Sequence, residues 1–454
     1  MKYTPHTEQE IKEMLTKIGV NSLDELFSTI PDNLKYKKPL ALDEGKSEVE
    51  IMEHMNAIAN AVMPLNEMSF LGGGCYPDFI PHIVDHFSGL GEFLTAYTPY
   101  QAEASQGTLQ VIFEFQTLMA RLLKMDVANA SMYDGATATV EAAFMAVSSQ
   151  KKRNKVIAAG ALHYEYKQVL KTYFKYIDSE VEFLDENPET GTISIEDLKK
   201  VLDDKTAAVI VQQPNFLGLL EDMDELSKTI HEAGALLISV VEPISLGILK
   251  TPGEYEADIA IGEGQPLGAY SNYGGPGFGF FSTRDGNFKK GDHMRKMPGR
   301  IVSRTVDADG NPAYALALQT REQHIRRAKA TSNICTNQGL MAFRALVYMS
   351  MFGKEGYYEQ SERVTQLAHF AAEKLSAIDG FSMKYQAPFF REFVLQTPDN
   401  ADTLFRKLAM YHIYPGIPLS WFYPERKNEL LVSVSTLNTA DSIEKLARNM
   451  KNLA

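Results

Sequence analysis

The chain has 454 residues and a formal net charge of −13 at pH 7. An acidic surface does not suit a polyphosphate or an anionic membrane, so neither nucleic acid nor a membrane surface is an expected partner. The only two cysteines, Cys75 and Cys335, exclude a disulfide scaffold and indicate a reducing, cytoplasmic compartment. The first residues lack the apolar stretch of a signal peptide, and no run of about 18 apolar residues would span a membrane.

Two amphipathic helices are predicted near the N-terminus, over residues 7–18 and 48–62. Each starts with a hydroxyl residue followed three positions later by glutamate, which is the spacing of a capping box (Thr7 and Ser47 are the hydroxyl residues). We therefore expect residues 1–68 to form a helical arm that packs against the main domain or a partner subunit.

Residues 105–285 alternate between strand and helix patterns. Short buried strands are expected at residues 156–159, 181–184, 208–212, 236–241, 258–261 and 279–282. Helices are expected between them, with Ser194 and Asp222 at two of the helix starts and Gly234 after one helix end. This alternation predicts a mostly parallel sheet covered by helices on both faces.

The last part of the chain has a different pattern. A long helix is expected over residues 340–378, followed by strands at 391–395 and 430–435 and helices at 401–412 and 440–450. An extended loop over about 285–335, rich in Arg and Thr, is expected to join the two parts. The predicted domains are thus the helical arm (1–68), a large α/β domain with the extended loop (69–335) and a small α+β domain (336–454).

The segment LTAYTPYQAEASQG, at residues 94–107, is rich in hydroxyl and amide groups. Tyrosine rings with polar tips suit the lining of a ligand pocket. The candidate lining residues are Tyr97, Tyr100, Ser105 and Gln106. Composition alone favours a buried loop whose hydroxyl groups satisfy backbone groups, so the residues by themselves do not establish a pocket.

Two glycine-containing segments follow predicted strands. At Asp134-Gly135 a strand end leads into an Ala-rich helix, where backbone N–H groups could bind phosphate. A carboxylate at the N-cap satisfies the helix end and repels an anion, so a capped core helix is the better interpretation. The loop within residues 258–279 is not a P-loop, and a ligand-binding edge and an ordinary connection remain equally open.

The segment TREQHIRRAKATSNICT, at residues 320–336, combines basic and hydroxyl side chains. It fits a phosphate contact, although a solvated charge run is the commoner explanation. His82 and His86 have the i, i+4 spacing of metal ligands, but no third ligand is evident, so no metal site is expected. Cys335 has no evident histidine partner and is expected to be a small buried residue rather than a nucleophile.

Together, the motifs identify a family. FLGGG, LTAYTPYQAEASQG, NASMYDGATA, LHYEYKQVLKTY, YGGPGFGFF and ATSNICTNQ resemble the P-protein of the glycine cleavage system, a glycine dehydrogenase (aminomethyl-transferring, decarboxylating). The resemblance covers essentially the whole chain and is to subunit 1 of the split, two-subunit form. It implies the α/β fold of pyridoxal-phosphate-dependent transferases, which is aspartate aminotransferase-like (fold type I), with a mostly parallel sheet and a small α+β C-terminal domain.

The resemblance also implies that this chain does not hold the cofactor. In subunit 2 of that family the cofactor lysine precedes a loop ending in GGPG, and nine positions before Gly274 this chain has Gln265. A glutamine amide cannot form a Schiff base. The residue after the strand ending at Val241 is Glu242, where an aspartate is expected, and Asp134 occupies the phosphate region. Pyridoxal phosphate is therefore expected to be bound covalently by the partner subunit.

The implied function follows from that arrangement. Glycine dehydrogenase subunit 2 and this chain would together decarboxylate glycine and transfer the aminomethyl group to the lipoylated H-protein, as a heterotetramer. Tyr97, Tyr100, Ser105 and Gln106 would line the shared glycine pocket, and two residues, Thr331 and Ser332, would reach the partner's cofactor phosphate. The alternatives are an autonomous pyridoxal-phosphate decarboxylase or transaminase that uses another lysine, and a non-catalytic regulatory pseudoenzyme.

Overall fold

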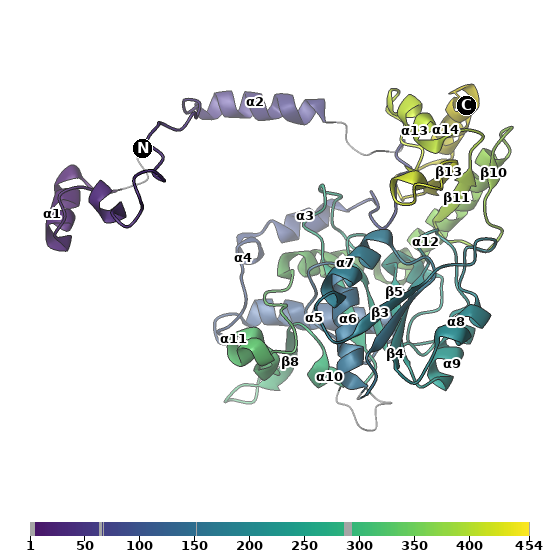
Figure 1. The fold of residues 1–454 in the computed structure, drawn as a ribbon, viewed down its shortest axis with the longest axis horizontal. Helices are drawn as coiled ribbons and strands as arrows, with labels where there is room; N and C mark the ends of the chain where they lie inside the picture. Colours follow the sequence, from purple (N-terminus) through teal and green to yellow (C-terminus); the bar gives the residue numbers. More distant parts are fainter. Residues whose placement is uncertain (1–4, 63–65, 67, 151, 286–292, 454) are drawn as a thin grey trace. The chain divides into compact units, whose positions relative to one another are not determined.

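The structure is a computed structural model (Figure 1). It describes residues 5–62, 66, 68–150, 152–285 and 293–453. The chain divides into two compact units, Met1–Met63 and Pro64–Ala454. In these parts of the chain, no helix is both long enough and apolar enough to cross a membrane.

The first unit contains helices α1 (Glu8–Ile18) and α2 (Glu48–Ala61), with the short 3-10 helix η1 (Asp24–Phe27) between them. Both α-helices begin with the predicted capping box. The hydroxyl of the N-cap residue, Thr7 or Ser47, accepts a hydrogen bond from the N–H of the third helical residue. The glutamate at that position accepts one in return. No residue of either helix is buried, and most of their apolar side chains are exposed.

The second unit is built on a seven-stranded sheet with the order β1-β7-β6-β5-β4-β2-β3. The strands are β1 (Val127–Ala128), β2 (Lys155–Ala159), β3 (Glu180–Leu184), β4 (Thr206–Gln213), β5 (Leu236–Val241), β6 (Ile259–Glu263) and β7 (Gly279–Thr283). From β6 to β3 the neighbouring strands are parallel, whereas β7 pairs antiparallel with β6 and β1. The mostly parallel sheet and its six predicted strands are confirmed.

Helices cover both faces of this sheet (Figure 1). They are α5 (Gln106–Leu123), α6 (Gly135–Ser149), α7 (Tyr164–Phe174), α8 (Ile195–Val201) and α9 (Met223–Glu232). Alternate residues along β2 face opposite layers because side chains in a strand have period two. Val156 packs in the core that contains α6 and α7, and Ile157 packs in the core that contains α8 and α9.

A second, antiparallel sheet has the order β10-β11-β13-β12. Its strands are β10 (Ser382–Met383), β11 (Glu392–Gln396), β12 (Ile417–Pro418) and β13 (Glu429–Ser433), and its helices are α13 (Ala401–Ala409) and α14 (Ala440–Leu453). The long helix α12 (Gly339–Ser376) is interrupted at Gly353, which has φ +59°. The core under the second sheet also contains Phe70 and Phe216, so it is continuous with the rest of the unit.

The remaining helices are short and lie in connections. They are α3 (His82–Ser88), α4 (Gly91–Leu94), η2 (Pro243–Gly247), α10 (His293–Lys296), η3 (Gln319–Arg321), α11 (Gln323–Arg326), η4 (Arg327–Lys329) and η5 (Leu419–Trp421).

The prediction of an extended loop over about 285–335 is wrong for much of its length. Strands β8 (Ile301–Val306) and β9 (Pro312–Ala317) form an antiparallel hairpin there. Asp307 closes the turn by accepting hydrogen bonds from the N–H groups of residues 309 and 311. An Asp-Gly pair between two strand-like segments is a hairpin signal. Residues 286–292 of the predicted loop lie outside the described residues.

Two glutamine amides attach this hairpin to α5. Gln106 donates from Nε2 to the carbonyl of Tyr314 and accepts from its N–H, both at 2.9 Å. Gln116 does the same for Val302, at 3.0 and 2.9 Å. Each side chain thus pairs with both polar groups of one strand residue, as a neighbouring strand would.

Gln106→Ala is expected to lower the free energy of unfolding by about 1–3 kcal/mol, because it leaves two backbone groups of Tyr314 without partners. Amide hydrogen exchange should accelerate over β8 and β9. The control is Gln110→Ala on the same helix, where the amide contacts only the exposed Glu114 side chain. Equal exchange in the two variants would contradict this role of Gln106.

Candidate functional site

Polar side chains gather at the carboxyl ends of the central parallel strands. Gln213 ends β4, Glu242 follows β5, and Glu263 ends β6. In open α/β sheets, ligands bind beyond the carboxyl ends of the strands. This edge is therefore the first place to test for a cofactor site.

Gln265, two residues beyond β6, uses its whole amide to hold another segment of the chain. Its Oε1 accepts from the N–H of Tyr76 at 2.9 Å, and its Nε2 donates to the carbonyls of Tyr76 and Ala269 at 2.9 and 2.7 Å. The side chain is 7% exposed. The Tyr76 segment is thereby fixed across the strand edge.

The N-terminus of α6 is occupied by carboxyl groups of the chain itself. Asp134 is the N-cap and accepts from the N–H of Thr137 at 2.7 Å, as predicted. Glu263 accepts from the N–H of Gly135 at 2.9 Å. Burial raises the pKa of Glu263 to about 7, and the nearby Asp134 charge adds to this, while backbone N–H groups oppose it. Glu263 was not among the predicted site residues, although it stands two residues before Gln265 at the end of a predicted strand.

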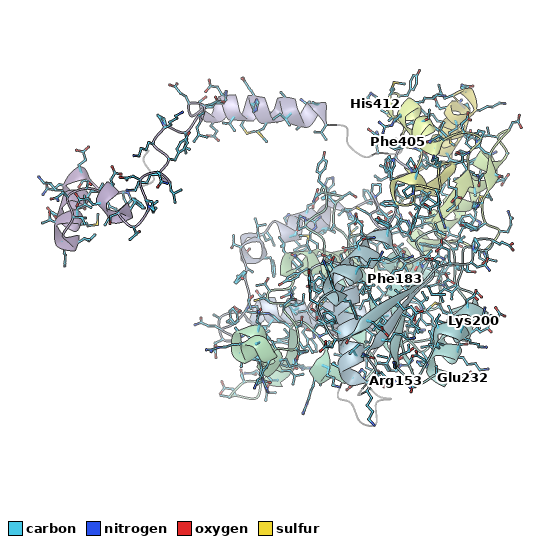
Figure 2. All side chains as sticks on the ribbon, viewed as in Figure 1. Arg153, Phe183, Lys200, Glu232, Phe405 and His412 are labelled. Carbon is cyan, nitrogen blue, oxygen red and sulfur yellow. The ribbon has the colours of Figure 1, made fainter. Side chains whose placement is uncertain are left out.

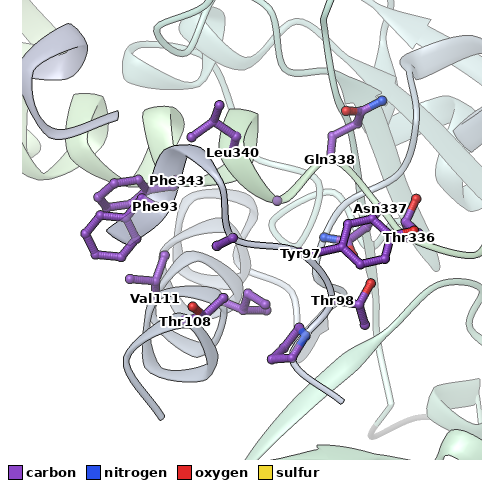
Figure 3. Close-up of a pocket in the computed structure, with 14 residues that line it drawn as sticks. Phe93, Tyr97, Thr98, Thr108, Val111, Thr336, Asn337, Gln338, Leu340 and Phe343 are labelled. Carbon is purple, nitrogen blue, oxygen red and sulfur yellow. The ribbon is translucent and has the colours of Figure 1, made fainter. Parts of the chain in front are cut away.

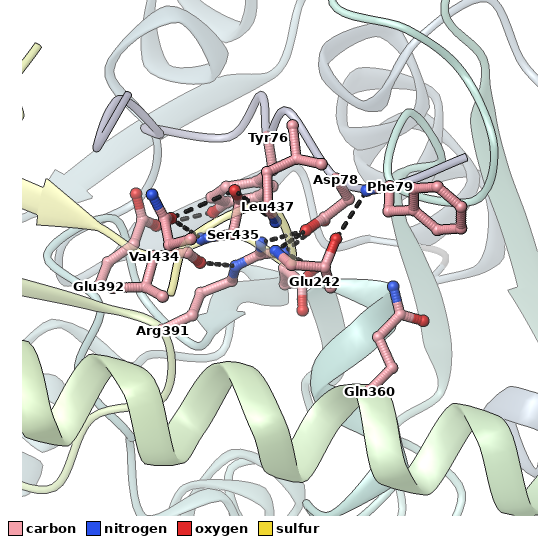
Figure 4. Close-up of polar contacts among 12 residues, drawn as sticks. Tyr76, Asp78, Phe79, Glu242, Gln360, Arg391, Glu392, Val434, Ser435 and Leu437 are labelled. Atoms are coloured by element: carbon pink, nitrogen blue, oxygen red, sulfur yellow. Dashed lines mark hydrogen bonds and ion pairs between the residues drawn. The ribbon is translucent and has the colours of Figure 1, made fainter. Parts of the chain in front are cut away.

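A buried ion-pair network fills the space beside Glu242 (Figure 4). Arg391 donates to both carboxylate oxygens of Asp78, at 2.8 and 2.9 Å, and its guanidinium carbon lies 4.0 Å from the centre of the Tyr76 ring. Glu242 lies 3.5 Å from the same guanidinium. Burial raises the pKa of Glu242 to about 7, although Arg391 acts in the opposite direction. Asp78, which makes both short contacts, is therefore the closer carboxylate partner of Arg391.

The hydroxyl end of the Tyr76 side chain is also held by a hydrogen bond. Its hydroxyl donates to Glu392 at 2.7 Å, and the same carboxylate accepts from the N–H of Gly73 at 2.7 Å. The FLGGG segment and strand β11 of the C-terminal sheet are thereby joined. The cavity that remains at the strand edge measures about 30 Å³ and is lined by residues that include His163, Tyr166 and Glu263.

A larger pocket lies where the two most distinctive sequence motifs meet (Figure 3). It has a volume of about 280 Å³. Its polar lining comes from Tyr97 and Thr98 in the first motif and from residues 336–338 in the second, and Phe93 and Phe343 form part of an apolar wall. Tyr97 is 73% exposed. Large exposed aromatic side chains beside a pocket are typical of surfaces that bind a ligand or a partner.

The other predicted site residues lie around this pocket without lining it. Tyr100 accepts a hydrogen bond from Arg300 at 3.1 Å, and Gln106 holds the hairpin. Ser105 is the N-cap of α5 but makes no capping hydrogen bond with its side chain. Thr331 is exposed, and Ser332 is half-buried and accepts from the N–H of Ile334 at 3.0 Å. The pocket thus contains one of the six predicted side chains, Tyr97.

Within the described part of the chain, Cys335 is exposed in the connection that precedes α12, so the prediction that it is buried is wrong. No three His, Cys, Asp or Glu side chains in that part of the chain gather in an arrangement that could hold a metal ion.

The glycine cleavage system P-protein family matches residues 1–450 of the chain. A relative from Carboxydothermus hydrogenoformans, described as a probable glycine dehydrogenase (decarboxylating) subunit 1, is 47% identical over 98% of each chain. A relative from Desulforamulus reducens with the same description is 45% identical over 99% of each chain. This chain belongs to the glycine cleavage system P-protein family.

Solved structures agree with this P-protein assignment. A glycine decarboxylase (P-protein) of the glycine cleavage system, crystallised in inhibitor-bound form, is similar over 100% of both chains, with a TM-score of 0.89 and 38% identity. The glutamate decarboxylase of Lactobacillus brevis shares only the fold, with a TM-score of 0.66 and 11% identity over 93% of this chain and 96% of that one. The predicted pyridoxal-phosphate-dependent fold type I is confirmed.

Pyridoxal phosphate does not fit the strand edge of this P-protein chain. Gln265 cannot bind it covalently, and Glu263 and Asp134 place carboxyl groups where a phosphate would need the α6 N–H groups. The cavity of about 30 Å³ is far below the roughly 300 Å³ of a small-molecule pocket. Side chains of this chain itself therefore occupy most of the strand edge.

Proposed function

We propose that this chain is subunit 1 of a two-subunit glycine dehydrogenase and that it completes the active site of subunit 2. The observation that carries the proposal is the Glu263 carboxyl on the α6 N-terminus, beside an immobilised Gln265. A P-protein chain whose own strand edge is closed needs a partner to hold the cofactor. The names of the relatives as subunit 1 support the same conclusion.

The pocket formed by the two motifs is the part that this chain would contribute. Tyr97 would lie in the wall of the glycine pocket. Tyr100, Ser105 and Gln106 would support the loop and the helix α5 that hold Tyr97 in place. Thr331 and Ser332 would reach the phosphate of the partner's cofactor. The exposure of Tyr97 and Thr331 supports these roles, because both side chains are accessible to a second chain.

Pyridoxal phosphate on subunit 2 would supply the electron sink that allows the glycine carboxylate to leave as CO₂. The aminomethyl group would then pass to the lipoyl arm of the H-protein. We place this activity in the cytoplasm, where free thiols persist, because the two cysteines of the chain do not form a disulfide with each other.

The test uses purified full-length subunits, separately and mixed, with lipoylated H-protein. Visible absorbance reports the bound cofactor, and glycine–bicarbonate exchange reports decarboxylation. We expect neither signal from this chain alone, and exchange only after mixing. A cofactor band and exchange from this chain alone would establish the autonomous enzyme instead. Undiminished exchange by subunit 2 alone would establish the regulatory pseudoenzyme.

Replacing Thr331 and Ser332 together with alanine is expected to weaken cofactor retention in the assembled complex by about tenfold, because charge-assisted hydrogen bonds to phosphate would be lost. Equilibrium dialysis of the complex against pyridoxal phosphate measures this change. The matched control is Thr172→Ala on α7, where the hydroxyl donates only to a helix carbonyl. Unchanged retention in the double variant would remove the phosphate assignment.

A further inference from the structure

Arg300 lies between the two loops that line the pocket. Its side chain is almost completely buried, at 1% exposed. Its Nε donates to the carbonyl of Cys335 at 2.6 Å, and its Nη2 donates to the hydroxyl of Tyr100 at 3.1 Å. Tyr100 directly follows the lining segment 97–99, and Cys335 directly precedes the lining segment 336–340. One guanidinium group therefore connects both motifs at the edge of the pocket.

The surroundings of Arg300 are those of an ion pair that is incompletely satisfied. Glu322 lies 3.6 Å from Nη2 and is itself buried. His324 lies 3.5 Å from the same carboxylate and packs edge-on against the Tyr100 ring. Arg300 Nη1 and Glu322 Oε1 are buried without hydrogen-bond partners. Such groups cost stability, so their presence favours a role other than stabilising the fold.

We propose that Arg300 is a positioning residue that holds the Tyr100 and Cys335 loops in the geometry required for glycine binding. This inference rests on the proposed function. A planar guanidinium can donate to both loops at once from different nitrogens, whereas a lysine ammonium is a single point charge on a flexible stem. Loss of Arg300 should let the two loops move independently while the sheet beneath them stays folded.

Arg300→Lys is the direct test, in the full-length chain assembled with subunit 2. We expect the KM for glycine in the exchange reaction to rise about tenfold with little change in kcat, because the loops bind substrate without touching the reacting atoms. Tyr100→Phe should raise KM less. The double variant should be no worse than Arg300→Lys alone, since both substitutions break the same connection.

Arg153→Lys is the matched control, because Arg153 also donates to two backbone carbonyls, those of Thr206 and Ala233. Arg153 (labelled in Figure 2) contacts Thr206 at the amino end of β4 and does not line the pocket. The Arg153→Lys substitution should lower the unfolding midpoint of the chain without changing the KM for glycine.

An unchanged KM in Arg300→Lys, with a lower unfolding midpoint, would overturn the inference and leave Arg300 as a stabilising residue. If Arg300→Lys fails to fold, an unchanged KM in Tyr100→Phe would overturn it as well. Absence of exchange in the wild-type pair is a different failure, because it removes the proposed function itself.

Discussion

Asp78→Asn is expected to lower the free energy of unfolding by about 3–5 kcal/mol, because it leaves the buried guanidinium of Arg391 without its bidentate partner. Both side chains of this ion pair are 2% exposed, so water cannot replace the lost carboxylate. Among the described residues, Glu242 is the only other carboxylate within ion-pair distance of Arg391, at 3.5 Å. Chemical denaturation monitored by circular dichroism measures the change.

A second variant separates the charge from the packing. Asp78→Leu combined with Arg391→Met should recover much of the lost stability, since it removes both buried charges together. The control is Lys200→Ala on α8 (Lys200 is labelled in Figure 2). It removes a solvent-exposed ion pair with Asp197, so no measurable change is expected. A loss below about 1 kcal/mol in Asp78→Asn would show that the network contributes little to stability.

Gln265→Lys is expected to leave the isolated chain without stoichiometric pyridoxal phosphate, even though it restores a lysine at the family's cofactor position. The phosphate would still meet the carboxyl groups of Glu263 and Asp134 at the start of α6. The substitution also removes two hydrogen bonds between the Gln265 amide and the backbone of Tyr76, one to its N–H and one to its carbonyl. We expect it to destabilise the chain by about 1–3 kcal/mol.

Absorbance after dialysis, compared with the wild-type chain, measures the cofactor retained. The informative second variant adds Glu263→Ser, which replaces the carboxyl with a hydroxyl donor beside the Gly135 N–H. It should retain more cofactor than Gln265→Lys alone. A full, dialysis-resistant band in Gln265→Lys alone would contradict the idea that the carboxyl groups close the site.

Local features of the fold were predictable because they depend on neighbours in sequence. The capping boxes at Thr7 and Ser47 and the Asp134 N-cap formed as expected. Hydrophobic runs located the six predicted strands, since strands of a parallel sheet under two helix layers are largely apolar. The hairpin of β8 and β9 was not predicted although Asp309-Gly310 is a turn signal, because most of its residues are not buried and so no buried apolar run marks its strands.

The site depended on contacts between distant residues. The absence of a lysine at position 265 is a property of the sequence alone, and so is the presence of two polar motifs. Glu263 reaches Gly135 across 128 residues of sequence, and Gln106 reaches Tyr314 across 208. Those contacts exist only because the strand order places β6 beside the start of α6 and the hairpin beside α5. Local patterns determined the elements and the missing lysine, whereas the tertiary structure decided which groups close the strand edge and which line the pocket.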